Sequence, residues 1–199
     1  MSETKIFDKW TTDGIQVRDL GLEKYINLSP FMMPKSRGRH RSPFHKSKMS
    51  IIERLMNKMT VPGHRGKKHT ITSGKVVGKS VKTYKILKES FERIEKITKK
   101  NPVEVLVRAI ENSALREEIA AYQVGGIIVR RAVITSPQRR VDIALKNIAQ
   151  ASYRKAFGKR DTIVDSLTNE IVGAYNNDAS KSDAIREKER IERESESAR

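Results

Sequence analysis

The 199-residue sequence contains no cysteine, few aromatic residues and no long apolar run. Without cysteine, the chain cannot form disulfide bonds, use a thiol nucleophile or bind zinc through thiolates. No stretch approaches the roughly 20 apolar residues that a membrane-spanning helix needs. The first residues, MSETKIFDKW, lack the apolar segment of a signal peptide, so we do not expect secretion.

Acidic residues are scarce as well. The chain has 41 Lys and Arg against 24 Asp and Glu, a net charge of +17. Residues 35–100 hold 20 of the basic and only 4 of the acidic side chains, and residues 130–160 hold nine basic side chains and one acidic. Blocks of one charge sign repel themselves and are typical of proteins that bind a polyanion. Nucleic acid is therefore the first expected partner, and an anionic membrane surface the second.

Apolar periodicity predicts a mainly α fold with about five to six helices. The strongest helix start is Asn101-Pro102, because Asn caps a helix well and Pro fits its first position. Thr162 is the candidate cap of a later helix. The expected main helices begin at Ser47, Ser80, Asn101, about Val141 and Thr162, and a short one lies near Leu22–Leu28.

Residues 115–135 have a different pattern, which predicts a β-hairpin. Gly125-Gly126 separates two apolar segments, and the second segment is rich in β-branched residues. A helix would place both glycines in its interior, at a cost of about 1 kcal/mol each. The expected tip consists of Val124, Gly125, Gly126, Ile127 and Ile128. Exposed apolar residues at a tip indicate contact with RNA bases or a partner, so we expect the tip to serve function and not folding.

These patterns divide the chain into three parts. Residues 1–48 form an N-terminal extension with a basic, extended arm, and residues 49–177 form a helical core that carries the protruding hairpin. Residues 178–199 are a charged tail or helix without an apolar stripe for firm docking. We expect residues 35–48 to be disordered until they bind RNA, because they contain almost nothing to bury.

The basic side chains of the charged blocks are the candidate RNA-binding residues, because Lys and Arg neutralise phosphates. Arg139 and Arg140 precede a helix, where the helix dipole disfavours cations, so a phosphate ligand is expected there. For Arg130 and Arg131, protection of an edge strand is the alternative. The candidates are Lys35, Arg37, Arg39, Arg41, Lys46, Lys48, Arg54, Lys58, Arg65, Lys67, Lys68, Lys75, Lys79, Arg130, Arg131, Arg139 and Arg140.

Other kinds of site find little support. Gly74–Ser80 resembles a P-loop, but only three residues separate its glycines where the motif needs four. A nucleotide-using enzyme that acts on RNA, and a DNA-compacting protein, are the alternatives to an RNA-binding protein. The four histidines lie in the basic block without cysteine or clustered carboxylates, so we expect no metal and no cofactor. No set of nucleophile, base and orienting residue is evident, so we expect no catalysis.

Several segments, in order, resemble the small-subunit ribosomal protein seven family, in its archaeal and eukaryotic form. They are Ile52–Met59, Gly66-Lys67-Lys68, the run NPVEVLVRAIENS from Asn101, the Gly125-Gly126 hairpin, and the run VRRAVITSPQRR from Val129. The resemblance covers roughly residues 50–175, and residues 5–29 resemble the N-terminal extension of archaeal and eukaryotic members.

The resemblance implies a helical domain with a protruding hairpin and no enzymatic activity. It implies a structural protein of the small ribosomal subunit in the cytoplasm, without a membrane partner. Members bind the 3′ major domain of the small-subunit rRNA and help to nucleate assembly of the subunit head. Their hairpin lies near the mRNA exit path and the E-site tRNA, and their C-terminal helix approaches a neighbouring small-subunit ribosomal protein.

Overall fold

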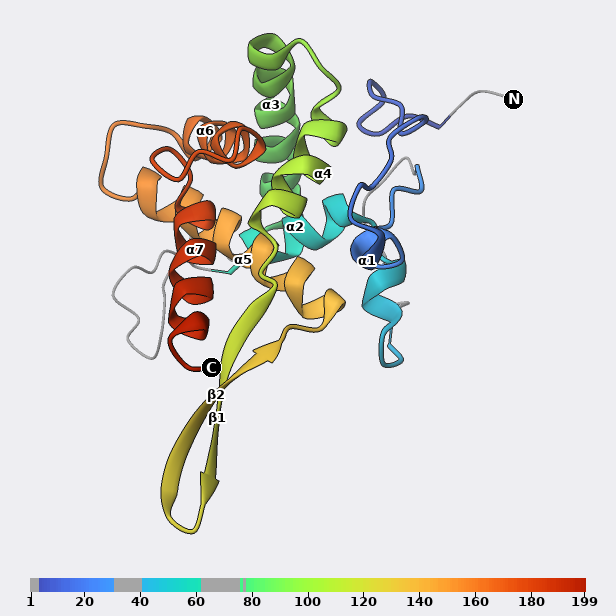
Figure 1. Ribbon diagram of the computed structural model, residues 1–199. Helices are drawn as coiled ribbons and strands as arrows, with labels where there is room; N and C mark the ends of the chain where they lie inside the picture. Colours follow the sequence, from blue (N-terminus) through green and yellow to red (C-terminus); the bar gives the residue numbers. More distant parts are fainter. Residues whose placement is uncertain (1–3, 31–40, 62–75, 77) are drawn as a thin grey trace.

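The computed structural model describes residues 4–30, 41–61, 76 and 78–199 (Figure 1). Within these residues the chain forms seven α-helices and one antiparallel hairpin, which confirms the predicted mainly α class. The helices are α1 (Leu20–Glu23), α2 (Ile51–Met59), α3 (Ser80–Thr98), α4 (Pro102–Ser113), α5 (Pro137–Ala156), α6 (Ile163–Tyr175) and α7 (Asp183–Glu196). A 3-10 turn spans His45–Lys48.

Polar caps fix where the main helices begin. The side chain of Asn101 accepts a hydrogen bond from a backbone N–H in the first turn of α4, and Pro102 is the first residue of that helix. Thr162 caps α6 in the same way, so both predicted caps are confirmed. Ser50 and Ser182 cap α2 and α7. Each cap satisfies a backbone donor that has no partner inside its own helix.

One apolar core joins the helices. Leu87 of α3, Leu106 of α4, Leu145 of α5 and Ile171 of α6 are all fully buried in it. Along each of these helices the buried apolar residues recur at helical spacing, so each helix presents one apolar face to its neighbours. The core therefore holds α3 to α6 in fixed relative positions, and the hairpin leaves it between α4 and α5.

Residues 4–30 pack against this core, although the sequence predicts an arm here. Phe7 and Trp10 are buried, and their rings meet Phe91 of α3 edge to face at centroid distances of 5.7 and 5.8 Å. Leu22 and Ile26 are buried as well. The sequence predicts an arm with one short helix near Leu22–Leu28. The short helix is present as α1 (Leu20–Glu23), but the segment is packed on the core and is not a free arm. A few large side chains without a helical period anchor it, and a periodicity analysis does not detect such anchors.

The 3-10 turn corrects a second expectation. Residues 35–48 are predicted to lack structure without RNA, but residues 45–48 form this turn in the protein alone. Lys46 fastens the turn by an ion pair with Asp142 of α5, at 2.6 Å. Residues 31–40 lie outside the described residues, so the prediction for that part stays a prediction.

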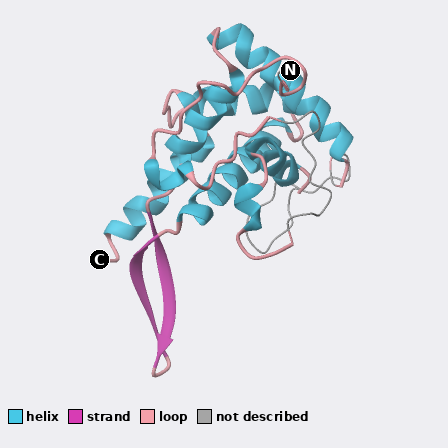
Figure 2. Ribbon diagram, turned by 90° about the vertical axis from the view of Figure 1, so that its right-hand side faces the viewer, coloured by secondary structure: helices cyan, strands magenta, loops and turns pink. Residues whose placement is uncertain are grey.

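The hairpin consists of β1 (Glu117–Val124) and β2 (Ile127–Ile134) and projects away from the helices (Figures 1 and 2). Val124 pairs with Ile127, and the two residues between them form the turn. Gly125 and Gly126 have φ angles of 55° and 86°, a region that disfavours residues with a Cβ. The predicted hairpin and its glycine turn are both confirmed.

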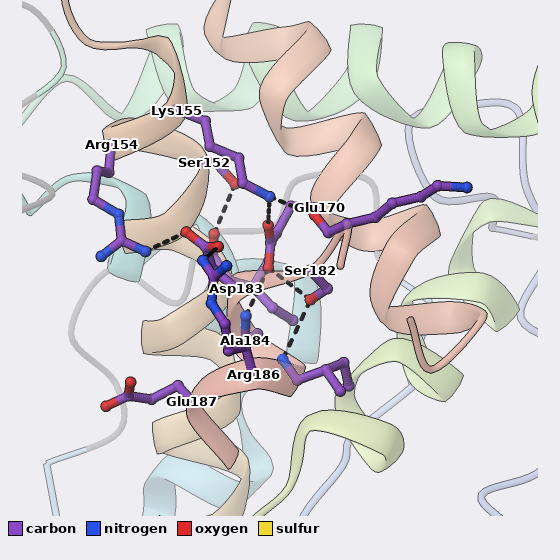
Figure 3. A network of polar contacts seen from close by, with 12 residues as sticks. Ser152, Arg154, Lys155, Glu170, Ser182, Asp183, Ala184, Arg186 and Glu187 are labelled. Carbon is purple, nitrogen blue, oxygen red and sulfur yellow. Dashed lines mark hydrogen bonds and ion pairs between the residues drawn. The ribbon is translucent and has the colours of Figure 1, made fainter. Parts of the chain in front are cut away.

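The C-terminal helix α7 docks firmly, and the expectation of a weakly attached tail is wrong. Ala184 and Ile185 are buried, and the fully buried carboxylate of Glu170 on α6 accepts three hydrogen bonds around them (Figure 3). The donors are the Ser182 hydroxyl at 2.7 Å, the Ala184 backbone N–H at 2.9 Å and the Lys155 ammonium at 2.6 Å. Polar anchors at the start of α7 thus replace the missing apolar stripe.

The other end of α7 supports the base of the hairpin. Glu192 accepts a hydrogen bond from the backbone N–H of Arg116 at 3.0 Å, directly before β1. Arg199 pairs with Glu117 at 2.5 Å. Figure 1 shows the C-terminus beside the root of the two strands. Because α7 is held at both ends, it fixes the direction in which the hairpin leaves the body.

Candidate nucleic-acid interface

The tip of the hairpin is apolar and exposed. Val124, Ile127 and Ile128 have exposed fractions of 57%, 70% and 68%. Two glycines form the turn between the strands, and neither has an atom within 4 Å of where a Cβ would be. A turn that projects in this way with bare apolar side chains can lie against the faces of nucleic-acid bases or against an apolar partner.

Arg130 and Arg131 follow the tip along β2, and both are exposed. Their cross-strand neighbours are Ala121 and Ala120, whose side chains offer no polar group. Neither arginine forms an ion pair with any described residue. Because successive side chains of a strand point to opposite faces, each face of the hairpin carries one uncompensated guanidinium. Arginines in this state are suited to bind phosphates.

A groove of 790 Å³ lies next to the hairpin base, and we call it the α5–α7 groove. One side chain of α2, one of β1 and residues just before and after the hairpin strands complete its lining. The lining residues are Lys58, Leu115, Glu118, Ser136, Gln138, Arg139, Asp142, Ile143, Lys146, Asn147, Gln150, Glu187, Arg190 and Ile191. Two of the predicted RNA-binding residues, Lys58 and Arg139, thus lie in this groove beside polar side chains that the sequence did not single out.

Internal ion pairs neutralise most of the acidic groups in this groove. Arg139 binds Glu118 through two hydrogen bonds, of 2.6 and 2.7 Å, and the bond raises the pKa of Arg139. Asp142 is paired with Lys46 and Arg54. Burial opposes ionisation of Asp142, yet these two cations lower the pKa of its carboxyl below the ordinary value. The carboxylates of the groove therefore do not repel an anion as free ones would.

Two lysines give the groove a net positive character. Lys58 and Lys146 form no ion pair with any described residue. Burial, followed by the nearby charges of Lys46 and Lys146, lowers the pKa of Lys58, although Asp142 acts in the opposite direction. An anion bound between Lys58 and Lys146 would relieve this repulsion. The groove is therefore electrostatically suited to a phosphate.

A second groove, of 680 Å³, lies at the hairpin base beside the N-terminal segment. Its lining includes Arg18 and Arg116, both exposed, and Ile134, which is 87% exposed. Arg140 also lines it, but pairs with Asp19 at 2.7 Å and donates to the carbonyl of Leu115 at 2.8 Å. The hairpin base thus carries exposed cations beside two grooves.

Among the predicted RNA-binding residues, Arg54 is the one whose prediction is wrong. Its side chain is 1% exposed, pairs with Asp142 at 3.2 Å and donates to the Tyr25 carbonyl at 2.7 Å. Burial lowers the pKa of Arg54. A guanidinium in this position cannot reach a phosphate, so we exclude Arg54 from the interface. In the sequence Arg54 lies one helical turn from Lys58 on α2, and this spacing does not show that Arg54 is buried whereas Lys58 lines the groove.

The remaining predicted residues fall into two groups. Arg41, Lys48 and Lys79 are exposed on the surface, and Lys46 is bound to Asp142. The others lie outside the described residues: Lys35, Arg37, Arg39, Arg65, Lys67, Lys68 and Lys75.

Sequence reasoning missed five candidates, namely Arg18, Arg116, Lys146, Asn147 and Gln150. Lys146 belongs to the basic concentration of residues 130–160, which is the only signal that could have selected it. The other four carry no local signal. Arg18 and Arg116 are isolated cations, and the two amides become notable only through their surroundings in the groove.

The alternative sites of the sequence gain no support. The only strands among the described residues are the two antiparallel ones of the hairpin, and residues 62–75, which precede the P-loop-like segment and include its start, lie outside the described residues. No group of His, Asp and Glu in the described parts of the chain could hold a metal ion. None of the described helices is long and apolar enough to cross a membrane.

Comparison with known proteins adds independent evidence. The family described as ribosomal protein S7p/S5e matches residues 22–199. The chain is 45% identical over 196 residues to small ribosomal subunit protein uS7 of Nanoarchaeum equitans, covering 98% of each chain. It is 46% identical over 198 residues to uS7 of Archaeoglobus fulgidus, covering 99% of this chain and 96% of the relative. The chain therefore belongs to the ribosomal protein S7p/S5e family.

Proposed function

We propose that this protein binds the 3′ major domain of the small-subunit rRNA and helps to nucleate assembly of the subunit head. Family membership makes it a structural, non-enzymatic protein of the small ribosomal subunit, with rRNA and other ribosomal proteins as partners. The observation that carries the finer proposal is the distribution of cations along the hairpin. Arg130 and Arg131, in the middle of β2, have no carboxylate partner among the described residues, and two grooves with exposed cations lie at the hairpin base.

The mechanism is neutralisation of phosphates by side chains that the helical core holds in place. Double-stranded RNA is recognised mostly through its shape and its phosphates, which requires cations at fixed mutual distances. The core fixes α5, and α7 fixes the root of the hairpin through Arg116 and Glu117. Cations on both elements thus keep their spacing without RNA, which reduces the entropy lost on binding.

A binding assay with full-length protein tests the rRNA assignment. The probes are a transcript of the 3′ major domain, a 5′ domain transcript of equal length and a DNA duplex, all at the same salt concentration. We expect at least tenfold tighter binding to the 3′ major domain. Equal affinity for the two transcripts would contradict the proposal, and equal affinity for the DNA would favour a DNA-compacting protein.

The proposal extends to the hairpin tip, which we place near the mRNA exit path and the E-site tRNA. A photo-crosslinking residue at Ile127, in protein assembled into small subunits, should label mRNA or E-site tRNA. The matched control is Ile97 of α3, an apolar residue with an exposed fraction of 59% on the helical body. Equal labelling from both positions would contradict this placement.

The outer side of α7 is the proposed contact for a neighbouring ribosomal protein. Arg186, Glu189, Arg193 and Glu196 are exposed there. Mixed charges of this kind suit a polar protein contact better than a continuous phosphate backbone. Crosslinking from Glu189 in assembled subunits should yield a protein adduct, and an adduct with RNA alone would contradict the assignment.

A further inference from the structure

Each of two side-chain amides in the α5–α7 groove has one polar atom without a hydrogen-bond partner among the described residues. Asn147 has an exposed fraction of 7%, and the atom is its Nδ2. In Gln150 the atom is the buried Oε1. The two residues are three positions apart on α5, so they occupy the same face of the helix, and both line the groove. Unpaired buried amide atoms cost stability, so these two atoms call for a partner that the described residues do not supply.

The amides lie in a groove whose other features suit an anion with a flat apolar part. Lys58 and Lys146 line the groove without an ion-pair partner among the described residues. Leu115, Ile143 and Ile191 supply apolar lining. The volume of 790 Å³ lies within the range of about 300–1,000 Å³ that is typical of pockets for small organic groups.

The form of RNA that could use this groove follows from its polar groups. In a double helix the bases are stacked, and the deep major groove is too narrow for side chains to read. Proteins read RNA sequence mainly from unstacked bases, which hydrogen-bond to side chains along their exposed edges. Each carboxamide has a donor and an acceptor, and a base edge presents the same two kinds of group side by side.

We propose that the α5–α7 groove binds one unstacked nucleotide of single-stranded RNA. Asn147 and Gln150 hydrogen-bond to the base edge, and Lys58 and Lys146 bind the adjoining phosphates. The inference rests on the proposed rRNA-binding function and adds to it a site that distinguishes one base from another. The cations elsewhere at the hairpin base bind RNA regardless of sequence, so the two amides would be the source of specificity at this position.

The double variant Asn147→Ala/Gln150→Ala tests the inference in the full-length protein. The probes are fluorescently labelled octamers of A, C and U, and an RNA duplex of the same length, with binding followed by anisotropy. We expect the wild type to prefer one octamer, and the double variant to bind that octamer about tenfold more weakly. Binding of the duplex should not change. The control is Asn169→Ala, which removes an exposed amide of α6 and should leave all affinities unchanged.

A second measurement does not depend on a variant. In the wild type, the side-chain amide NMR signals of Asn147 and Gln150 should shift when the preferred octamer is added, and those of Asn169 should not. Unshifted signals, or an unchanged affinity of the double variant, would overturn the inference. Neither result would affect tight binding of the 3′ major domain transcript, which tests the proposed function separately.

Discussion

The sequence contains two Arg-Arg pairs nine positions apart, and the structure gives them opposite surroundings. Arg130 and Arg131, in the middle of β2, face alanines across the hairpin and have no ion pair with a described residue. Arg139 and Arg140, at the start of α5, are paired with Glu118 and Asp19. The same dipeptide thus offers free charge at one place and serves the fold at the other.

The partners explain why the sequence does not reveal this difference. Glu118 is 21 positions from Arg139, and Asp19 is 121 positions from Arg140. The sequence predicts that both arginine pairs bind phosphates. For Arg139 and Arg140 the reason is that cations at a helix start are disfavoured unless an anion is present. Anions are indeed present at the start of α5, but they are the carboxylates of Glu118 and Asp19 and not phosphates.

Removing a carboxylate that pairs with a cation of the protein should lower stability. The largest loss of unfolding free energy is expected for Asp142→Ala. The change leaves the buried guanidinium of Arg54 without its carboxylate. Because an uncompensated buried charge is costly, we expect the free energy of unfolding to fall by about 3–5 kcal/mol. Urea denaturation measures this loss.

A control separates the charge from the lost packing. The double variant Arg54→Met/Asp142→Ala removes the buried charge together with its partner. It should therefore be more stable than Asp142→Ala alone. If it is less stable, the guanidinium contributes through its shape and its bond to the Tyr25 carbonyl, and our electrostatic explanation is wrong.

The next effect concerns the pair at the start of α5. Arg139→Ala/Arg140→Ala removes a largely exposed ion pair and a shielded one, since the side chains of Arg139 and Arg140 are 59% and 14% exposed. It also leaves the carbonyl of Leu115 without its side-chain donor. We expect a loss of about 2–4 kcal/mol in unfolding free energy, most of it from Arg140. A variant as stable as the wild type would show that these arginines are free for RNA after all.

The double variant Arg130→Ala/Arg131→Ala should weaken RNA binding and leave stability unchanged. Both side chains are exposed and neither pairs with a described residue, so the melting temperature should stay near that of the wild type. RNA binding should lose about one to two units of the slope of log affinity against log salt concentration, because each phosphate contact contributes about 0.7 to 0.9. A lower melting temperature together with an unchanged salt slope would show that Arg130 and Arg131 stabilise the fold and do not bind phosphates.

A smaller effect on stability is expected at the hairpin tip. Deleting residues 124–128 removes Val124, Ile127 and Ile128, whose side chains are exposed and touch no part of the core. The change in unfolding free energy should stay within about 0.5 kcal/mol, as for other exposed sites, whereas translation by reconstituted subunits should decline. A clear loss of stability would instead assign the tip to the fold.

How much the sequence predicts depends on how far apart the interacting residues are. Local patterns predicted the helices and the Gly125-Gly126 hairpin, because caps, periodicity and turns involve neighbouring residues. Docking of α7 was missed, because it depends on Glu170 meeting the start of a later helix. The same holds for the site: its charge was predictable from composition, but the separation of free from paired arginines was not, and nothing local marked Asn147.

The smallest expected effect is the pH dependence of the ion pairs around Asp142. Burial disfavours its ionised form, but Lys46 and Arg54 lower the pKa of the carboxyl overall. The unfolded chain has the ordinary value, about 3.9, so the folded state holds its charge to a lower pH. The stabilisation is therefore complete above the unfolded pKa and is lost as the pH falls through the folded one. Asp142→Asn lacks this titration, so the stability difference between wild type and variant, measured by urea denaturation from pH 7 downward, should shrink on acidification. A difference that stays constant to low pH would mean that Asp142 stabilises the fold through its shape and not through its charge, and that its ion pairs with Lys46 and Arg54 contribute no electrostatic stability.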